Sequence, residues 1–363
     1  MTRLLRYGLC CLVAILCGVP ALAQLSGPRY AHTATMLPDA TVLICGGLGR
    51  GNWFTRGADL VCLSDESVIK APSPHRNRAF HTATLLHDGT VLIAGGFIRP
   101  YATSRTAELF TGKSFIFLES RMSAPRELHA ATLLQDGRVL ITGGFVGGVT
   151  SLPLCDIYEP SKRAFRPTSR MQETRFGHAA CLLSDGRVLI SGGSQFPGEK
   201  TLASTEIYDP ATETFTDGPV MSQERSRHTA TRLLDGRVLI TGGNSITAKG
   251  QLADTELYDP AAGTFSPGPE MAEARMDHTA TLLPDGRVLI TGGFNGAGEH
   301  HTVASCDVYD PATNSISPTD PLPYPVHEQK ATLIAEDAVL VSGGLVVKGQ
   351  KQGAVPILVV VEP

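Results

Sequence analysis

The sequence lacks three features that would mark common functional classes: a strong net charge, a long apolar run and a paired set of cysteines. It has 31 basic and 35 acidic residues among 363, which gives no electrostatic basis for binding nucleic acid or an anionic membrane. The apolar stretch at residues 8–18 is shorter than the roughly 20 residues that a spanning helix needs. We therefore expect neither nucleic-acid binding nor stable membrane insertion.

The first 23 residues have the pattern of an export signal. Arg3 and Arg6 precede the apolar stretch, and Ala21-Leu22-Ala23 has the Ala-x-Ala form of a signal-peptidase site. We expect cleavage before Gln24 and a secreted or periplasmic protein. Removal of the two arginines leaves 29 basic and 35 acidic residues, a net charge of −6.

What the chain does contain is a sevenfold internal repeat. Glycine doublets begin 49, 48, 49, 50, 50 and 51 residues apart, and the amino-acid sequence before them recurs, as in HAATLLQDGRVLITGG and HTATLLPDGRVLITGG. A period of about 50 residues indicates repeated supersecondary units. The doublets begin at Gly46, Gly95, Gly143, Gly192, Gly242, Gly292 and Gly343.

Each repeat predicts a four-stranded antiparallel sheet. In the fifth copy, Asp235-Gly236 joins two alternating runs, which is a β-hairpin signal. A third strand ends at Tyr258-Asp259-Pro260, and a fourth surrounds Phe265. Such sheets bury both faces only by stacking around an axis, so seven copies predict an all-β, seven-bladed propeller that forms a single domain over residues 24–363.

The repeat resembles the kelch motif across nearly the whole mature chain. It combines the glycine doublet with an acid, Tyr-Asp-Pro, and an aromatic residue seven positions beyond the tyrosine. Tyrosine stands at Tyr158, Tyr208, Tyr258 and Tyr309, with Phe110 and Val61 as departures, and the aromatic place holds Phe117, Phe165, Phe215 and Phe265, with Ile316 and Val68 as weaker substitutes. The kelch resemblance implies a propeller and, among its relatives, both binding proteins and small-sugar enzymes.

Three further positions recur in six copies and fail together in the seventh. An arginine stands three residues before a histidine, and an acid stands two residues before the tyrosine place. We interpret the arginine and acid as a buried charge pair, since buried charges require partners. We expect the histidines to be packed and bonded to neighbouring backbone, because residues in six separate blades cannot converge on one metal. The arginines are Arg29, Arg78, Arg126, Arg175, Arg225 and Arg275; the histidines are His32, His81, His129, His178, His228 and His278; the acids are Asp59, Glu108, Asp156, Glu206, Glu256 and Asp307.

The five cysteines outside the signal are expected to be buried free thiols. Four of them replace small strand residues in separate blades, too far apart for disulfides, and their spacing matches no zinc motif. We therefore expect no metal and no cofactor. They are Cys45, Cys62, Cys155, Cys181 and Cys306.

The connections on one face differ in every copy, and function is expected there, because binding residues usually lie on loops of a rigid frame. The residue before each recurring histidine begins the innermost strand at the mouth of the channel. The polar residues at this position in consecutive blades either bind a ligand or neutralise one another's charges. The candidate ligand-binding residues are Arg50, Trp53, Phe80, Arg99, Tyr101, Arg227, Asp277, His300 and Glu328.

Two functions remain open on the sequence. The first is a non-catalytic, exported recognition or scaffold protein that binds a protein or glycan ligand through the variable face. The second is suggested by the kelch resemblance, whose propellers include a periplasmic sugar mutarotase; Glu328, Asp277 and His327 would supply its acid and base. Copper radical oxidases of the same superfamily need converging Tyr, Tyr, His and Cys residues, which the sequence does not offer.

The end of the chain predicts an incomplete seventh blade. After Gly344 only one further strand, residues 357–361, remains before Pro363, and the missing fourth strand would fall inside the export signal. We expect a three-stranded seventh blade with an exposed apolar outer edge, closed against the first blade by packing. Either residues 24–28 partly cover this edge, or it contacts a partner. Leu25 aligns with Met122, Met171, Met221 and Met271 in the repeat.

Overall fold

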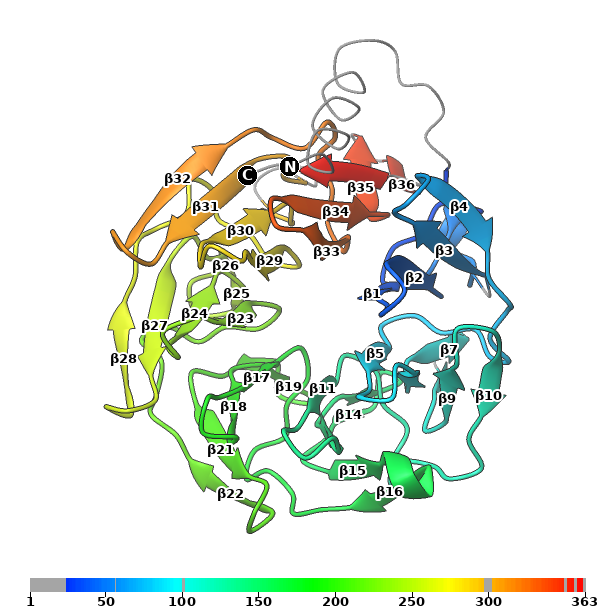
Figure 1. Cartoon of the computed structure of the whole chain (residues 1–363). Helices are drawn as coiled ribbons and strands as arrows, with labels where there is room; N and C mark the ends of the chain where they lie inside the picture. Colours follow the sequence, from blue (N-terminus) through cyan, green and yellow to red (C-terminus); the bar gives the residue numbers. More distant parts are fainter. Residues whose placement is uncertain are drawn as a thin grey trace, which may run out of the picture.

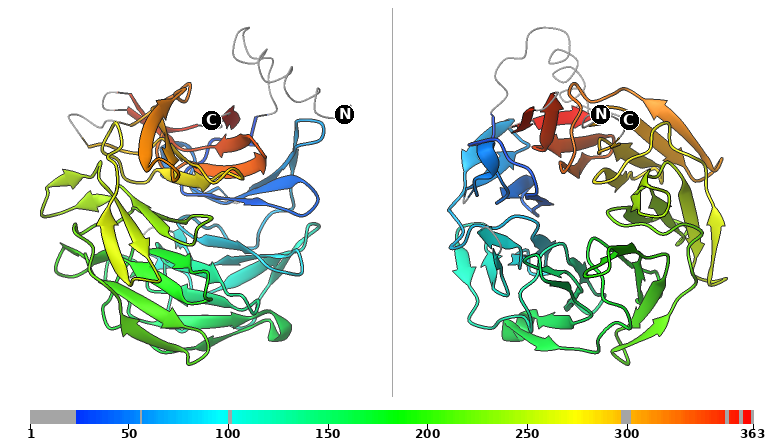
Figure 2. Two further views of the ribbon diagram at one scale, coloured as in Figure 1. Left: turned by 60° about the vertical axis from the view of Figure 1, so that its left-hand side comes forward. Right: turned by 180° about the vertical axis from the view of Figure 1, so that it is seen from behind.

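The computed structural model describes residues 24–55, 57–99, 102–296, 302–348, 351–355 and 358–361. Seven antiparallel sheets stand around a central opening as the blades of a propeller (Figures 1 and 2). The predicted all-β, seven-bladed fold is confirmed. The described part of the chain contains no helix long and apolar enough to span a membrane.

The first four blades each contain four strands in chain order from the axis outward. Their bounds are β1 (Thr33–Met36), β2 (Thr41–Cys45), β3 (Ala58–Cys62) and β4 (Ser67–Lys70); β5 (Thr82–Leu85), β6 (Val91–Ala94), β9 (Ala107–Phe110) and β10 (Phe115–Phe117); β11 (Ala130–Leu133), β12 (Val139–Thr142), β15 (Cys155–Glu159) and β16 (Ala164–Pro167); and β17 (Ala179–Leu182), β18 (Val188–Ser191), β21 (Thr205–Asp209) and β22 (Thr214–Asp217).

The remaining three blades continue the ring, and the seventh has one strand fewer. They are β23 (Thr229–Arg232), β24 (Val238–Thr241), β27 (Thr255–Asp259) and β28 (Thr264–Pro267); β29 (Thr279–Leu282), β30 (Val288–Thr291), β31 (Cys306–Asp310) and β32 (Ser315–Thr319); and β33 (Lys330–Ala335), β34 (Ala338–Ser342) and β37 (Leu358–Val361).

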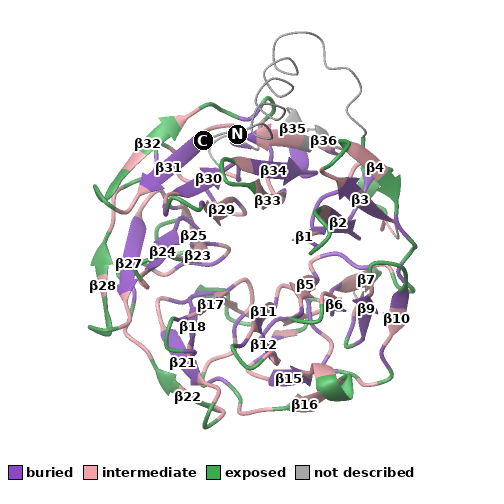
Figure 3. Ribbon diagram, in the orientation of Figure 1, coloured by how far each residue is buried: buried purple, intermediate pink, exposed green. Residues whose placement is uncertain are grey.

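The second strand of each blade forms the core. Val-Leu-Ile runs such as Val139–Thr142 are buried on both faces, because each sheet is covered by a neighbour on either side. The outermost strands β22, β28 and β32 are largely exposed (Figure 3). Asp-Gly turns enter these strands: Asp136 accepts a hydrogen bond from the Arg138 amide at 3.0 Å, and Gly137 takes a left-handed φ of 85° that glycine adopts without strain.

The glycine doublets join each blade to the next. The second glycine donates its amide to the carbonyl of the next blade's recurring arginine, as Gly96 does to Arg126 at 2.8 Å. A Cβ on the first glycine, Gly95, would lie 2.7 Å from that same carbonyl, so the first position has no room for a side chain. The bond also runs from Gly344 to Arg29 at 2.8 Å, so blade 7 meets blade 1 as any other pair does.

The seventh blade is three-stranded, as predicted, and no fourth strand pairs with β37 among the described residues. Leu25 is 4% exposed and packs with Val360 and with buried residues of β2 and β34. The expectation of an exposed apolar edge is wrong for the side chains that the structure describes: Val361 is buried and Val359 is half-buried, because neighbouring blades cover both faces. What stays unpaired is the outer backbone edge.

One repeat position was misaligned from the sequence. In the second blade the aromatic residue opposite the tyrosine place is Phe115, which pairs with Phe110 with ring centroids 4.9 Å apart. Phe117 pairs with Glu108 instead. The third-to-fourth strand connection of this blade is shorter than in the others, which shifts the register by two residues.

Each recurring arginine is buried and paired with the recurring acid of its own blade, as predicted. The six ion pairs are 2.6 to 3.1 Å long, and the guanidinium groups are at most 1% exposed. Arg126 shows the pattern: it donates to Asp156, to the carbonyl of Gly143 at 2.7 Å and to the carbonyl of Leu154 at 2.8 Å. The arginine therefore ties the first, second and third strands of one blade together.

The recurring histidines bond to hydroxyl groups of the preceding blade, not to backbone as expected. His178 Nε2 lies 2.8 Å from Thr142 Oγ1, and His32 Nε2 lies 3.0 Å from Ser342 Oγ, across the closure of the ring. Burial, followed by the nearby arginine charge, lowers the histidine pKa values, to about 3 for His81, His178 and His278. The six imidazoles are therefore neutral links between blades.

Candidate functional site

The variable connections lie together on one face, where most of them form small hairpins above the blades. Each hairpin follows a glycine doublet, and its first residue pairs with the segment that precedes an innermost strand, as Phe145 does with Glu127. These hairpins could not be predicted from the repeat because their residues differ from blade to blade. They are β7 (Phe97–Arg99) with β8 (Ala102–Thr103), β13 (Phe145–Val146) with β14 (Thr150–Ser151), β19 (Ser194–Gln195) with β20 (Lys200–Thr201), β25 (Asn244–Ser245) with β26 (Gly250–Gln251), and β35 (Leu345–Lys348) with β36 (Lys351–Ala354).

Seven residues with a left-handed backbone form a ring at the mouth of the channel on this face. Their φ angles lie between 51° and 60°. Along the ring six of the seven amides donate to the carbonyl of the preceding ring residue, at 2.7 to 3.2 Å. We call this the mouth ring: Ala31, Phe80, Leu128, Gly177, Arg227, Asp277 and Glu328.

The side chains of the mouth ring divide it into an apolar and a charged part. Phe80 packs against a cluster that contains Tyr30, Ala31 and Leu48. On the other side, Arg227 pairs with Asp277 at 2.9 Å and lies 3.8 Å from a Glu328 oxygen. The predicted neighbours from three consecutive blades are therefore brought together.

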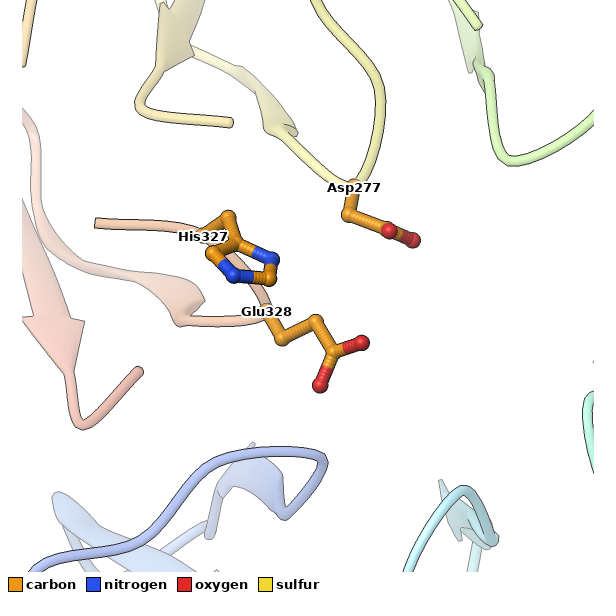
Figure 4. A group of neighbouring side chains, drawn as sticks. All are labelled: Asp277, His327 and Glu328. Atoms are coloured by element: carbon orange, nitrogen blue, oxygen red, sulfur yellow. The ribbon is translucent and has the colours of Figure 1, made fainter. Parts of the chain in front are cut away.

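His327 completes the charged part of the mouth ring. Ligand-type atoms of Asp277, His327 and Glu328 all lie within 4.8 Å of one another, and Figure 4 shows the imidazole to one side of the two carboxylates. His327 also stacks against Phe294, with ring centroids 5.4 Å apart. One oxygen of Glu328 and one nitrogen of His327 are buried and have no hydrogen-bond partner among the described residues.

Burial shifts the ionisation of this group. It raises the pKa of the Glu328 carboxyl, and the charge of Asp277 raises it further. It lowers the pKa of His327, against the pull of Asp277. The pKa of Arg227 is raised, chiefly by Asp277. A carboxyl that holds its proton towards neutral pH thus stands beside a neutral imidazole.

Glu127 and Lys330 interact electrostatically with this site and were missed from the sequence. Burial raises the pKa of Glu127 to about 7, and Arg227 opposes that shift. Burial lowers the pKa of Lys330, against the charges of Glu328 and Asp277. A signal was present: Glu127 and His327 occupy the same repeat position, one residue before the mouth ring, and Lys330 replaces a threonine or alanine of the other blades.

The other predicted residues do not join this cluster. Trp53 is 78% exposed beside the 3-10 turn η1 (Arg50–Asn52), so it does not cap its blade by burial. Arg50 and Arg99 are exposed near the same region. Phe80 lies in the apolar part of the mouth ring. Tyr101 and His300 fall outside the described residues.

The donor sets of the described residues do not fit a copper radical site. The group of three metal-type ligands in the described ranges consists of two carboxylates and one imidazole, and the guanidinium of Arg227 already balances Asp277. The five cysteines are free, lie in the strands and are buried or half-buried, and burial raises the thiol pKa of Cys45 to about 12. Such thiols are poor ligands and poor nucleophiles.

The comparisons agree with the repeat geometry. A model of the Kelch motif matches residues 175–222, which span the recurring arginine, the glycine doublet, Tyr208 and Phe215. The chain is a kelch-repeat β-propeller. No curated protein matches it.

Two solved structures resemble this kelch propeller in fold. One is a fungal alcohol oxidase of the AA5 family in complex with copper, with a TM-score of 0.71 and 17% identity, covering 92% of this chain and 75% of the oxidase. The other is YjhT, with a TM-score of 0.64 and 14% identity, covering 82% of this chain and 99% of YjhT. At these identities the likeness concerns the fold alone.

Proposed function

We propose that this kelch propeller is an exported recognition protein that binds a glycan at the mouth ring of its variable face. The observation that carries the proposal is the retention of side chains at the mouth ring. A left-handed backbone costs a non-glycine residue about 1 kcal/mol or more, and glycine avoids that cost. Only Gly177 uses this option, so the other six side chains are kept despite strain.

The chemistry of the mouth ring suits a sugar. Arg227, Asp277 and Glu328 offer donors and acceptors for hydroxyl groups, and two buried polar atoms there have no hydrogen-bond partner among the described residues. Phe80 on the apolar side and the exposed Trp53 at the rim supply flat surfaces against which a sugar ring packs. The N-terminal pattern of residues 1–23 supports export.

Binding is expected to depend on the mouth ring and the rim. Asp277→Asn should weaken glycan binding about 10-fold or more, because a charge-assisted hydrogen bond contributes about 1.5–3 kcal/mol. Trp53→Ala should weaken it while leaving the melting temperature unchanged, because the indole is exposed. A glycan array followed by calorimetry on the best hit measures both effects.

Asp285→Asn is the matched control on the opposite face, where Asp285 pairs with Arg287 at 2.7 Å. Its binding should equal that of the wild type. If Asp285→Asn abolishes binding while the Asp277 and Trp53 variants retain it, the proposed face is wrong.

A second candidate, interconversion of sugar anomers, is favoured by the ionisation of the mouth ring. Anomerisation needs a proton donor and an acceptor on the bound sugar, and the protonated Glu328 beside the neutral His327 can provide both. Glu328→Gln should then remove the rate enhancement without removing binding. Polarimetry or exchange NMR on a bound sugar tests this; equal rates with and without protein, or an active Glu328→Gln variant, exclude it.

A further inference from the structure

The opposite end of the channel contains a cavity that the repeat pattern does not explain. It has a volume of about 650 Å³, within the range of small-molecule sites. The strands β17, β23 and β29, which lie innermost around the opening (Figure 1), supply its wall together with the Asp-Gly turns. It lies on the face where the turns repeat, away from the mouth ring.

Arg232 is the exception to the repeat in this cavity. It ends the innermost strand and pairs in register with Val238. At the equivalent place the other blades have an apolar residue in the same register. These residues are Met36, Leu85, Leu133, Leu182, Leu282 and Leu333.

Arg232 is exposed, and its charge has no carboxylate partner in the described part of the chain. Within the described ranges no carboxylate lies within 4.0 Å of its guanidinium, whereas the arginines of the neighbouring turns, Arg187, Arg237 and Arg287, each pair with their own aspartate at 2.7 Å. The remaining wall combines the apolar side chains of Leu182, Leu282 and Leu234 with the polar residues Gln135 and Ser184. Leu234 is 68% exposed at the cavity, an apolar side chain held in solvent.

We propose that this cavity binds an aliphatic carboxylate, with the carboxylate on Arg232 and the chain along the leucines. A guanidinium matches a carboxylate with two parallel hydrogen bonds. One uncompensated positive charge suits a singly charged head group better than a phosphate. The apolar chain would cover Leu234, Leu182 and Leu282, removing their surface from water.

Calorimetric titration with sodium dodecanoate below its micelle concentration tests this. We expect binding of one molecule per chain and about a 10-fold or greater loss in Arg232→Leu, since a hydrogen bond to a charged group contributes about 1.5–3 kcal/mol. Leucine stands at this place in five other blades, so the variant should fold; its melting curve verifies that. Leu234→Ser should weaken binding more modestly.

Arg287→Leu is the control, because it removes a paired arginine from the same face, and it should bind dodecanoate as the wild type does. Dodecylammonium, with the same chain and the opposite charge, should not bind. Absence of dodecanoate binding, equal binding by Arg232→Leu, or equal binding of dodecylammonium would each overturn the proposal. Glycan binding at the mouth ring should be unchanged in Arg232→Leu, so the two sites can fail independently.

Discussion

Lowering the pH from 7 to 5 is expected to unfold the propeller or bring it close to unfolding. The six recurring histidines are neutral and buried in the fold, with pKa values of about 3 for His81, His178 and His278, against about 6.5 in an unfolded chain. The unfolded state therefore binds more protons, so stability is complete above pH 6.5 and falls as the pH drops towards 3.

The size of this effect follows from the shift. At pH 5 the solution is about 1.5 pH units below the pKa of an unfolded histidine, so each such histidine lowers the free energy of unfolding by about 2 kcal/mol. Three of them together approach the 5–15 kcal/mol that stabilises a typical domain. Glu127, with a pKa of about 7, and Glu328 act in the opposite direction, because the folded state holds their protons more tightly. These two carboxyl groups oppose the effect of six histidines.

Urea unfolding at pH 7.5, 6.5 and 5.5 measures this dependence. His278→Gln is the informative variant, because the seventh blade already has Gln329 at this place, where its amide donates to the Thr291 carbonyl at 2.8 Å. The variant should lose stability less steeply on acidification, whereas His87→Gln, at an exposed turn on the opposite face, should not differ from the wild type. An unchanged slope in His278→Gln would contradict the role given to the histidines.

Replacing a recurring arginine should cost more than any surface arginine. Arg225→Ala is expected to destabilise the protein by about 3–5 kcal/mol, because Glu256, 2.8 Å away and buried, is left as an unpaired charge. The variant also loses hydrogen bonds to Asp254 and to the Gly242 carbonyl, at 2.5 and 2.8 Å. Thermal or urea unfolding measures the loss.

Arg237→Ala is the matched control, since it removes a surface arginine paired with Asp235 in the same blade and should cost at most about 1 kcal/mol. The double variant Arg225→Met, Glu256→Leu should recover part of the stability, because no charge then remains buried. Equal unfolding midpoints for Arg225→Ala and Arg237→Ala would show that the buried pairs contribute nothing special.

The sequence was sufficient for the features that each copy repeats. The glycine doublets recur in all seven copies, the arginine and the acid recur in six copies and are missing from the seventh, and the seventh blade is one strand short. The structure confirms all three predictions. Contacts between copies were harder to foresee: the partner of His178 lies in another blade, on Thr142, and no period in one copy reveals it. Glu127 and Lys330 were missed because their importance depends on Arg227 and Glu328, which the ring places beside them. The ligand itself stays a prediction.

The mouth ring has a consequence for how this protein can change. Its position is fixed by backbone amides and carbonyls, and the blades beneath it are fixed by arginines, histidines and glycines that do not take part in it. The six side chains of the mouth ring are therefore separate from those that hold the architecture. Residues of the ring can therefore be substituted one blade at a time without unfolding the propeller. New binding specificities can arise in this way, by natural mutation or in a combinatorial library.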